Sequence, residues 1–165
     1  MLVVHGTRKF LDRVKGPVNA GDEKSTTELG DWYATVLFWK PQVALFVNEL
    51  TLVPVLVPMA PAVTVLDRLV PSVAAVLRAH GLGPLLVDNE VAEMMEQRLT
   101  TTQNRSVVGI MNEFAYLGEV YVRSNDAIDL PALSLRLAKT PCGPLYARHG
   151  SPDRELVAFA AQWPE

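Results

Sequence analysis

Residues 32–57 read WYATVLFWKPQVALFVNELTLVPVLV, and this stretch decides the fold. It holds three runs rich in Val, Leu, Phe, Tyr and Trp: residues 32–39, 43–49 and 52–57. Lys40-Pro41-Gln42 and Leu50-Thr51 are the short breaks between them, so the pattern predicts an antiparallel meander of three strands. Because Pro54 lacks the N–H of a ladder bond, the third run is expected at a sheet edge or a bulge.

The apolar run at residues 2–5 adds one more strand on the N-terminal side, which makes a sheet of about four strands. After Pro61 the apolar spacing becomes helical, and it stays helical to the C-terminus. The sequence therefore predicts an α+β fold in which a small, mostly antiparallel sheet packs against a helical C-terminal half.

Six helical segments are expected from apolar spacing and from capping residues. Two have irregular features: Pro71 predicts two short helices or one kinked helix, and Asn104 predicts the N-cap of a long helix that ends near Val122. The segments are residues 7–14, 63–77, a helix through Val87, Val91, Met94 and Leu99, 104–122, one capped by Asp129, and one opened by Ser151-Pro152.

The chain has 165 residues, which fits a single globular domain over residues 1–165. Residues 16–30 are rich in Gly, Asp, Glu, Ser and Thr and have little to bury, so we expect a mobile loop there. The longest uncharged stretch, residues 50–66, is too short for a membrane span and contains Pro54, Pro58 and Pro61. No membrane association is expected.

The formal net charge is −3, from 15 Lys and Arg against 18 Asp and Glu, and the pI is near 5.6. No strong uniform field attracts nucleic acid or anionic lipid, so any such binding must be local. Cys142 is the single cysteine and cannot form an internal disulfide, which fits a reducing cytoplasm.

A polar stripe follows one side of the expected helix 104–122. It consists of Arg105, Gly109, Asn112, Tyr116, Glu119 and Arg123. Arg105 and Ser106 occupy the first turn, where free N–H groups favour an anion. Gly109 costs about 1 kcal/mol relative to Ala inside a helix, so it indicates a close approach by another backbone or by a ligand. The alternative is an ordinary solvated helix face.

A second anion site is expected where the first strand passes through Gly6 into a helix start at Thr7, Arg8 and Lys9. The segment lacks the glycine spacing of a dinucleotide fingerprint or a P-loop, so it does not indicate a nucleotide by itself. A plain surface helix start is the alternative. We expect the two cationic helix starts to meet as one receptor for an anion.

Two further groupings have both structural and functional interpretations. Asp31, Tyr33 and Glu49 fall at one sheet edge if the first two meander strands pair, although turn chemistry also explains Asp31. The aromatic residues at 32–39 suggest bases stacked on a sheet, but alternation favours core packing. Trp32, Tyr33, Phe38 and Trp39 are the residues concerned.

Chemistry-bearing residues elsewhere form no known motif. His5, His80, His149 and Cys142 lack the short spacing of a zinc site, so no metal and no cofactor are expected. Cys142 is expected to be a buried inert thiol, and no glycine-flanked serine elbow is present. Catalytic residues therefore stay unassigned.

Three segments resemble a widespread bacterial family that is catalogued as a domain of unknown function. They are LGDWYA at 29–34, LFVNELTLVPVL at 45–56 and NRSVVGIMNEF at 104–114, and with Thr7-Arg8-Lys9 the resemblance covers about residues 1–120. The resemblance implies a bacterial intracellular protein and implies no activity. The tail beyond about Asp126 lies outside it.

The leading functional hypothesis is a non-catalytic binding or regulatory module whose surface accepts an anion. Its partner is a nucleic acid, a nucleotide or a protein, and its site residues are Thr7, Arg8, Lys9, Arg105, Ser106, Gly109 and Asn112. One alternative is a small enzyme acting on a phosphorylated substrate or nucleic acid, with Arg105 stabilising charge and Glu49 or Glu113 as base. A homo-oligomeric assembly subunit, such as a homodimer, is the other.

Overall fold

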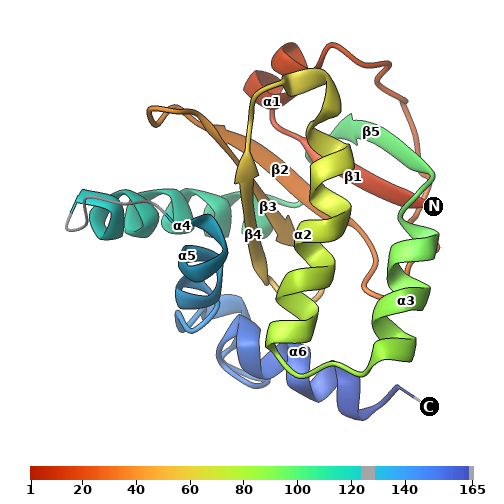
Figure 1. Ribbon diagram of the computed structural model, residues 1–165, viewed down its shortest axis with the longest axis vertical. Helices are drawn as coiled ribbons and strands as arrows, with labels where there is room; N and C mark the ends of the chain where they lie inside the picture. The colour runs from red at the N-terminus through yellow and green to blue at the C-terminus, as the bar shows by residue number, and fades with distance from the viewer. Residues whose placement is uncertain (124–128, 164–165) are drawn as a thin grey trace.

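The protein has an α+β fold built on one mixed sheet (Figure 1). The computed structural model describes residues 1–123 and 129–163, so the resemblance boundary at Asp126 lies outside the described residues. In these residues the sheet has five strands in the order β4-β3-β2-β1-β5. They are β1 (Leu2–Gly6), β2 (Trp32–Leu37), β3 (Val43–Asn48), β4 (Pro54–Pro58) and β5 (Gln97–Thr101).

The meander is confirmed, because β2 pairs antiparallel with β3 and β3 with β4. The expectation of a mostly antiparallel sheet of about four strands is wrong in two respects. β1 pairs in parallel with both of its neighbours, β2 and β5, which makes the sheet mixed, and β5 is a fifth strand. Hydrophobic alternation does not distinguish the two directions of pairing, so the sequence did not reveal the parallel pairs.

The helix expected through Leu99 ends earlier. Helix α3 spans Pro84–Glu93, and β5 then pairs with the whole of β1, from Leu2 opposite Gln97 to Gly6 opposite Thr101. Leu99 is buried in the core from the strand instead of from a helix. Leu99 is one apolar side chain among polar neighbours, so the sequence period cannot distinguish a strand from a helix here. The pairing with β1 determines that the segment is a strand.

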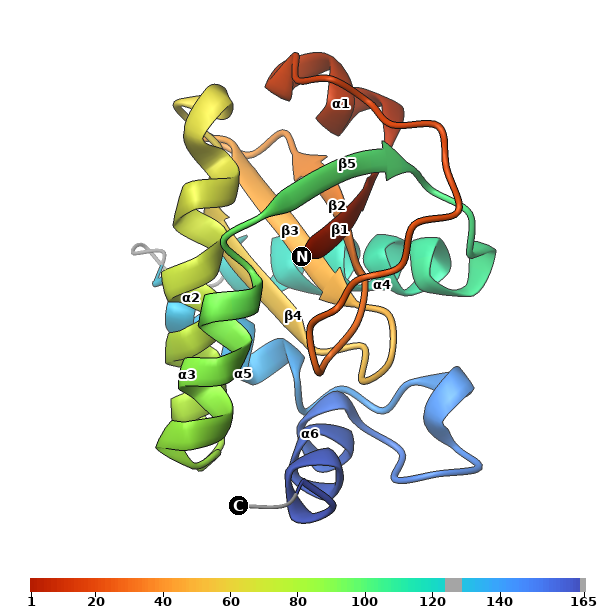
Figure 2. The ribbon, with the colours of Figure 1, turned by 90° about the vertical axis from the view of Figure 1, so that its right-hand side faces the viewer.

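Helices cover both faces of the sheet (Figures 1 and 2). On the first face, α1 (Arg8–Val14), α2 (Val65–Ala79) and α3 pack against the even-numbered side chains of β1 and β2. On the second face, α4 (Arg105–Arg123) and α5 (Leu130–Leu137) pack against odd-numbered side chains of β2 and β3. The remaining helical elements are α6 (Pro152–Ala161) and the short 3-10 turns η1 (Ala62–Thr64) and η2 (Gly143–Leu145).

Helix α2 runs through Pro71 as one helix, so of the two expected alternatives two short helices is wrong, and a kink at Pro71 stays a prediction. Pro71 is exposed, whereas Val70 and Val73 are buried in the core. The hydrogen bond that proline removes therefore lies on the solvent side, where water replaces the lost donor. The expected N-caps are confirmed at Asn104 and Asp129, whose side chains accept hydrogen bonds from the first-turn N–H groups.

Strand β4 lies at a sheet edge, as Pro54 predicts. The Leu56 N–H points away from β3 and donates to Ser134 Oγ at 2.9 Å. In an antiparallel strand the backbone N–H groups of alternate residues point to the same edge. Pro54 and Pro58, which have no N–H, therefore occupy the positions on this outer edge on either side of Leu56. The outer edge thus presents no unpaired N–H at these three positions, and another strand cannot pair with it through them.

The loop between α1 and β2 passes the end of β5 (Figure 2). Val18 forms a parallel bridge with Leu99, and Leu29 is buried. The loop's second half is anchored by the fully buried Glu90 of α3, which accepts hydrogen bonds from the N–H groups of Glu28 and Leu29 at 2.9 and 3.3 Å. Burial raises the pKa of Glu90 to about 7. Mobility of residues 16–30 stays a prediction, and these anchors oppose it at both ends of the loop.

Candidate functional site

Helix α1 places the first expected group of site residues over the first face of the sheet. Thr7 is the N-cap by position, but its hydroxyl donates to Thr35 Oγ1 at 3.0 Å and does not cap the helix. Arg8 and Lys9 are exposed, and Phe10 anchors the helix in the core. The cations of α1 therefore project into solvent.

Helix α4 places the second group on the other side of the sheet. Asn104 Oδ1 accepts from the N–H groups of Ser106 and Val107 at 3.0 and 3.3 Å. Two of the first-turn donors that we expected to meet an anion are therefore occupied by the cap. Arg105 and Ser106 remain exposed.

Gly109 and Asn112 lie on the solvent side of α4, opposite the buried Ile110 and Phe114. A Cβ built on Gly109 would meet no atom within 4 Å. No other backbone approaches Gly109 among the described residues, so of its two expected roles only contact with a ligand remains a prediction.

The two cationic helix starts belong to helices on opposite faces of the sheet. The side chains of the α4 stripe face away from the sheet on its second face, while α1 covers the first. Along β2, α4 begins beside Tyr33, whose hydroxyl accepts from the Asn104 N–H at 2.9 Å, and α1 begins beside Ala34, whose carbonyl oxygen accepts from the Thr7 N–H at 2.9 Å. The expectation of one shared receptor therefore stays a prediction.

Gly118, not Gly109, is the glycine of α4 that allows a close approach. A Cβ on Gly118 would lie 2.9 Å from Cη2 of Trp39, the residue that follows Phe38. We expect Gly118→Ala to lower the free energy of unfolding by about 1–3 kcal/mol through overpacking. Gly109→Ala is the matched control, and this substitution is expected to raise the free energy of unfolding by up to about 1 kcal/mol. Urea unfolding measures both, and equal effects of the two substitutions would contradict the packing.

A buried ion pair connects β1 to the segment before β2. His5 Nε2 lies 2.8 Å from Asp31 Oδ2, and its Nδ1 lies 3.0 Å from the carbonyl oxygen of Thr101. A carbonyl only accepts, so Nδ1 carries a proton, and Nε2–H donates a second hydrogen bond to the ionised Asp31. Burial disfavours the charge, but the hydrogen bonds to Asp31 and Thr101 outweigh it and raise the pKa of His5. These hydrogen bonds favour the imidazolium form of the ring.

Asp31 is ionised in this pair. Its burial is outweighed by hydrogen bonds from His5 and from the Ser25 N–H, which lower its pKa below the ordinary value. The His5 ring also stacks on Tyr33, with ring centroids 4.5 Å apart. Both ring nitrogens are engaged, so His5 is not available as a general base or as a metal ligand.

Asp31, Tyr33 and Glu49 do come together at the start of α4. Asn104 bridges Tyr33 and Glu49, because its N–H donates to the Tyr33 hydroxyl and its Nδ2 donates to Glu49 Oε1 at 3.4 Å. Asp31 and Glu49 line a shallow pocket of about 330 Å³. Glu28 and Arg148 also line it, and Arg148 is paired with the buried Glu155 at 2.7 Å. The pocket is acidic and does not suit an anion.

The other chemistry-bearing residues form no catalytic set. Burial and the nearby Glu113 raise the pKa of Cys142 to about 11, so its thiol stays protonated. His80 Nδ1 bonds the Val76 carbonyl, and His149 Nδ1 contacts Glu155. Within residues 1–123 and 129–163, no three His, Cys, Asp or Glu side chains are arranged to hold a metal ion. None of the helices described there is long and apolar enough to cross a membrane.

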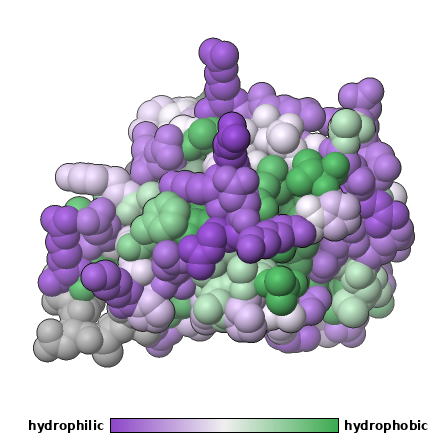
Figure 3. Space-filling view, turned by 90° about the horizontal axis from the view of Figure 1, so that it is seen from above, coloured by the Kyte–Doolittle hydropathy of each residue, from purple (hydrophilic) through white to green (hydrophobic). Residues whose placement is uncertain are grey.

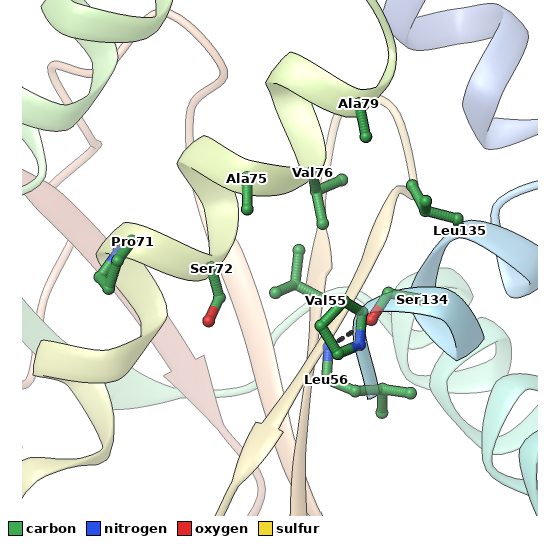
Figure 4. Close-up of a pocket in the computed structure, with 10 residues that line it drawn as sticks. Val55, Leu56, Pro71, Ser72, Ala75, Val76, Ala79, Ser134 and Leu135 are labelled. Carbon is green, nitrogen blue, oxygen red and sulfur yellow. Dashed lines mark hydrogen bonds between the residues drawn. The ribbon is translucent and has the colours of Figure 1, made fainter. Parts of the chain in front are cut away.

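An apolar pocket of about 220 Å³ lies between α2 and α5, beside the edge strand β4 (Figure 4). Val55, Val76 and Leu135 point into it, and Ser134 reaches β4 through its bond to the Leu56 N–H. No charged side chain lines this pocket. It therefore has no group that would hold an anion.

One surface combines cations with an exposed aromatic ring. We call it the α1 patch, and it consists of Arg8, Lys9, Arg13, Lys15 and Phe38. The Phe38 side chain is 58% exposed, and Lys9 Nζ lies 5.4 Å from the centroid of its ring. Figure 3, which shows the end of the molecule where α1 lies, has hydrophilic side chains projecting from it with apolar ones between them.

The sequence pattern assigns Phe38 to the buried side of the sheet. Trp32, Ala34 and Val36 face the first side of the sheet and are buried, and Phe38 continues this alternation one step beyond the end of β2. The sequence interpretation as core packing is confirmed for Trp32 and Tyr33, which are buried. It is wrong for Phe38.

Comparison with known proteins gives one family. The model of a domain of unknown function, DUF6933, matches residues 3–155, which extends the resemblance well beyond residue 120. No curated protein and no solved structure matches the chain. Over nearly its whole length, from the first strand to the last helix, the chain belongs to the DUF6933 family.

Proposed function

We propose that the protein is a non-catalytic intracellular binding module and that its anion-accepting surface is the α1 patch. The observation that carries this proposal is that Arg8, Lys9, Arg13 and Lys15 are all exposed and none pairs with a carboxylate in residues 1–123 or 129–163. Four neighbouring cations without internal partners form a local positive field, which an anion neutralises on binding.

The charge distribution supports this choice. Residues 1–15 hold four Lys and Arg and one Asp, a formal charge of +3, whereas residues 16–165 hold 11 Lys and Arg and 17 Asp and Glu, or −6. An anionic ligand is therefore attracted to the α1 patch and repelled by most of the remaining surface. The single buried Cys142 fits a reducing compartment.

The other expected sites have weaker support as anion sites. Two first-turn N–H groups of α4 are taken by Asn104, and the pocket beside Glu49 is acidic. The enzyme alternative needs a base close to Arg105. Glu113 lies near Cys142, whereas Glu49 accepts a hydrogen bond from Asn104, the residue before Arg105, and lines that acidic pocket. A binding role requires none of these groups.

Isothermal titration with inorganic tripolyphosphate tests the proposal. A variant with Arg8→Ala, Lys9→Ala and Arg13→Ala is expected to bind at least tenfold more weakly, since each lost contact with a charged group costs on the order of 1 kcal/mol. The matched control is Arg105→Ala, which removes an exposed cation from the other helix start and is expected to bind like the unaltered protein. Equal affinity of the triple variant, or no binding at all, would overturn the proposal.

A further inference from the structure

The proposed α1 patch contains an aromatic ring that its neighbours do not cover. Phe38 follows β2 on the face that α1 covers, and more than half of its side chain is in water. Burying a Phe side chain stabilises a protein by about 1.5–3 kcal/mol, so leaving it exposed forgoes that gain. The next residue, Trp39, packs against Gly118 on the opposite face. The backbone is therefore fixed on both sides of Phe38, and its ring is held at the surface.

A cation lies directly beside this ring. Lys9 Nζ is 5.4 Å from the ring centroid, and Arg8 and Arg13 are exposed on the same short helix. A ligand that reaches the ring therefore also meets positive charge. A nucleotide has this pair of features within one unit, because it joins a flat base to a phosphate.

From this juxtaposition, and resting on the proposed function of the α1 patch, we infer that the anionic partner is a single-stranded nucleic acid. A base stacks on Phe38, and neighbouring phosphates contact Lys9, Arg8 and Arg13. Aromatic rings accept bases of any sequence in single strands, where the base faces are accessible. In a duplex the base faces are covered by stacking, so Phe38 would have no partner there. The acidic remainder of the surface restricts the contact to a short segment of strand.

Fluorescence anisotropy with a short labelled oligo-deoxythymidine strand tests the inference. Phe38→Ala is expected to weaken binding about 5- to 150-fold, the range that corresponds to one base–aromatic stack. Phe38→Trp retains a ring and is expected to restore binding to within about threefold. Tyr146→Ala is the matched control, since Tyr146 is an exposed aromatic residue outside the patch, and the substitution is expected to leave binding unchanged. A duplex of the same length is expected to bind more weakly than the single strand.

The outcomes separate this inference from the proposed function. If the Phe38→Ala protein binds the strand as tightly as the unaltered protein, while the triple cation variant loses tripolyphosphate, the nucleic-acid inference fails and the anion surface stands. Equally tight binding of a polyglutamate peptide, with no effect of Phe38→Ala on either polymer, also overturns the inference. If neither polymer nor tripolyphosphate binds, the proposed function itself fails.

Discussion

Replacement of Asp31 by Asn is expected to destabilise the protein by about 3 kcal/mol near pH 5 and to leave its stability almost unchanged near pH 9. In the unaltered protein the His5 imidazolium donates to the Thr101 carbonyl and to the Asp31 carboxylate. The substitution removes the negative charge, and the new amide directs a donor at a ring nitrogen that already carries a proton. The imidazolium is then buried without a counter-ion.

The pH dependence follows from the direction of the pKa shifts. The pKa of His5 is raised in the folded state, so the stabilisation by its charge is fully present below the ordinary value of about 6.5 and is lost as the pH rises through the folded value. The pKa of Asp31 is lowered, so its contribution is present above about 3.8 and is lost in stronger acid. The pair therefore stabilises the fold most between about pH 4 and pH 6.5.

At high pH the neutral ring can keep the proton on Nδ1 for Thr101 and accept a hydrogen bond on Nε2 from the amide of the Asp31→Asn variant, so every polar group is satisfied. Urea unfolding across pH measures the difference between the free energies of unfolding of the two proteins. Glu90 titrates in both of them, so its contribution cancels in this difference. Asp31→Ala is the control, because it removes the Ser25 contact as well and is expected to destabilise at every pH. A pH-independent effect of Asp31→Asn would show that His5 is neutral in the fold.

Replacement of Asn48 by Asp is expected to cost about 4 kcal/mol or more at neutral pH, or to prevent folding. Asn48 is fully buried, and its Nδ2 donates to the carbonyl oxygens of Leu29 and Asp31 at 2.9 and 3.3 Å. Its Oδ1 accepts from the N–H and the hydroxyl of Thr51, each at 2.9 Å. A carboxylate would direct an anionic oxygen at two carbonyl oxygens.

This side chain joins the segment before β2 to the β3–β4 turn, in which Leu52 adopts the left-handed conformation with φ +61°. Thr51→Val is the matched control: it removes the hydroxyl and keeps the backbone bond, so it is expected to cost about 1 kcal/mol. Thermal unfolding by circular dichroism measures both variants. A stability of Asn48→Asp within about 1 kcal/mol of the unaltered protein would contradict the described network.

The strands of the meander and most helices could be predicted from the sequence because their apolar residues recur at periods of 2 and 3.6. The direction of β1 could not, since a parallel and an antiparallel partner bury the same side chains of Leu2 and Val4. Strand β5 was missed for a related reason. Its Leu99 fits a helical period with Met94 and Val91, and only the pairing with β1 shows otherwise.

The site was predicted less completely. The exposure of Arg8, Lys9 and Arg105 followed from their charge, but the placement of their helices on opposite faces of the sheet did not, because it depends on how the strands pair. The proximity of Asp31, Tyr33 and Glu49 followed from the pairing of β2 with β3. The ion pair of His5 with Asp31 did not, since it requires the parallel pairing of β1 with β2.

The most direct measurement of the claim that α1 carries the anion site is a titration of isotope-labelled protein with inorganic tripolyphosphate, followed by amide chemical shifts. We expect the signals of residues 8–15 and of Phe38 to move together and to saturate with one dissociation constant, while those of residues 105–112 stay in place. Movement confined to residues 105–112, or no saturable movement in either segment, would contradict it.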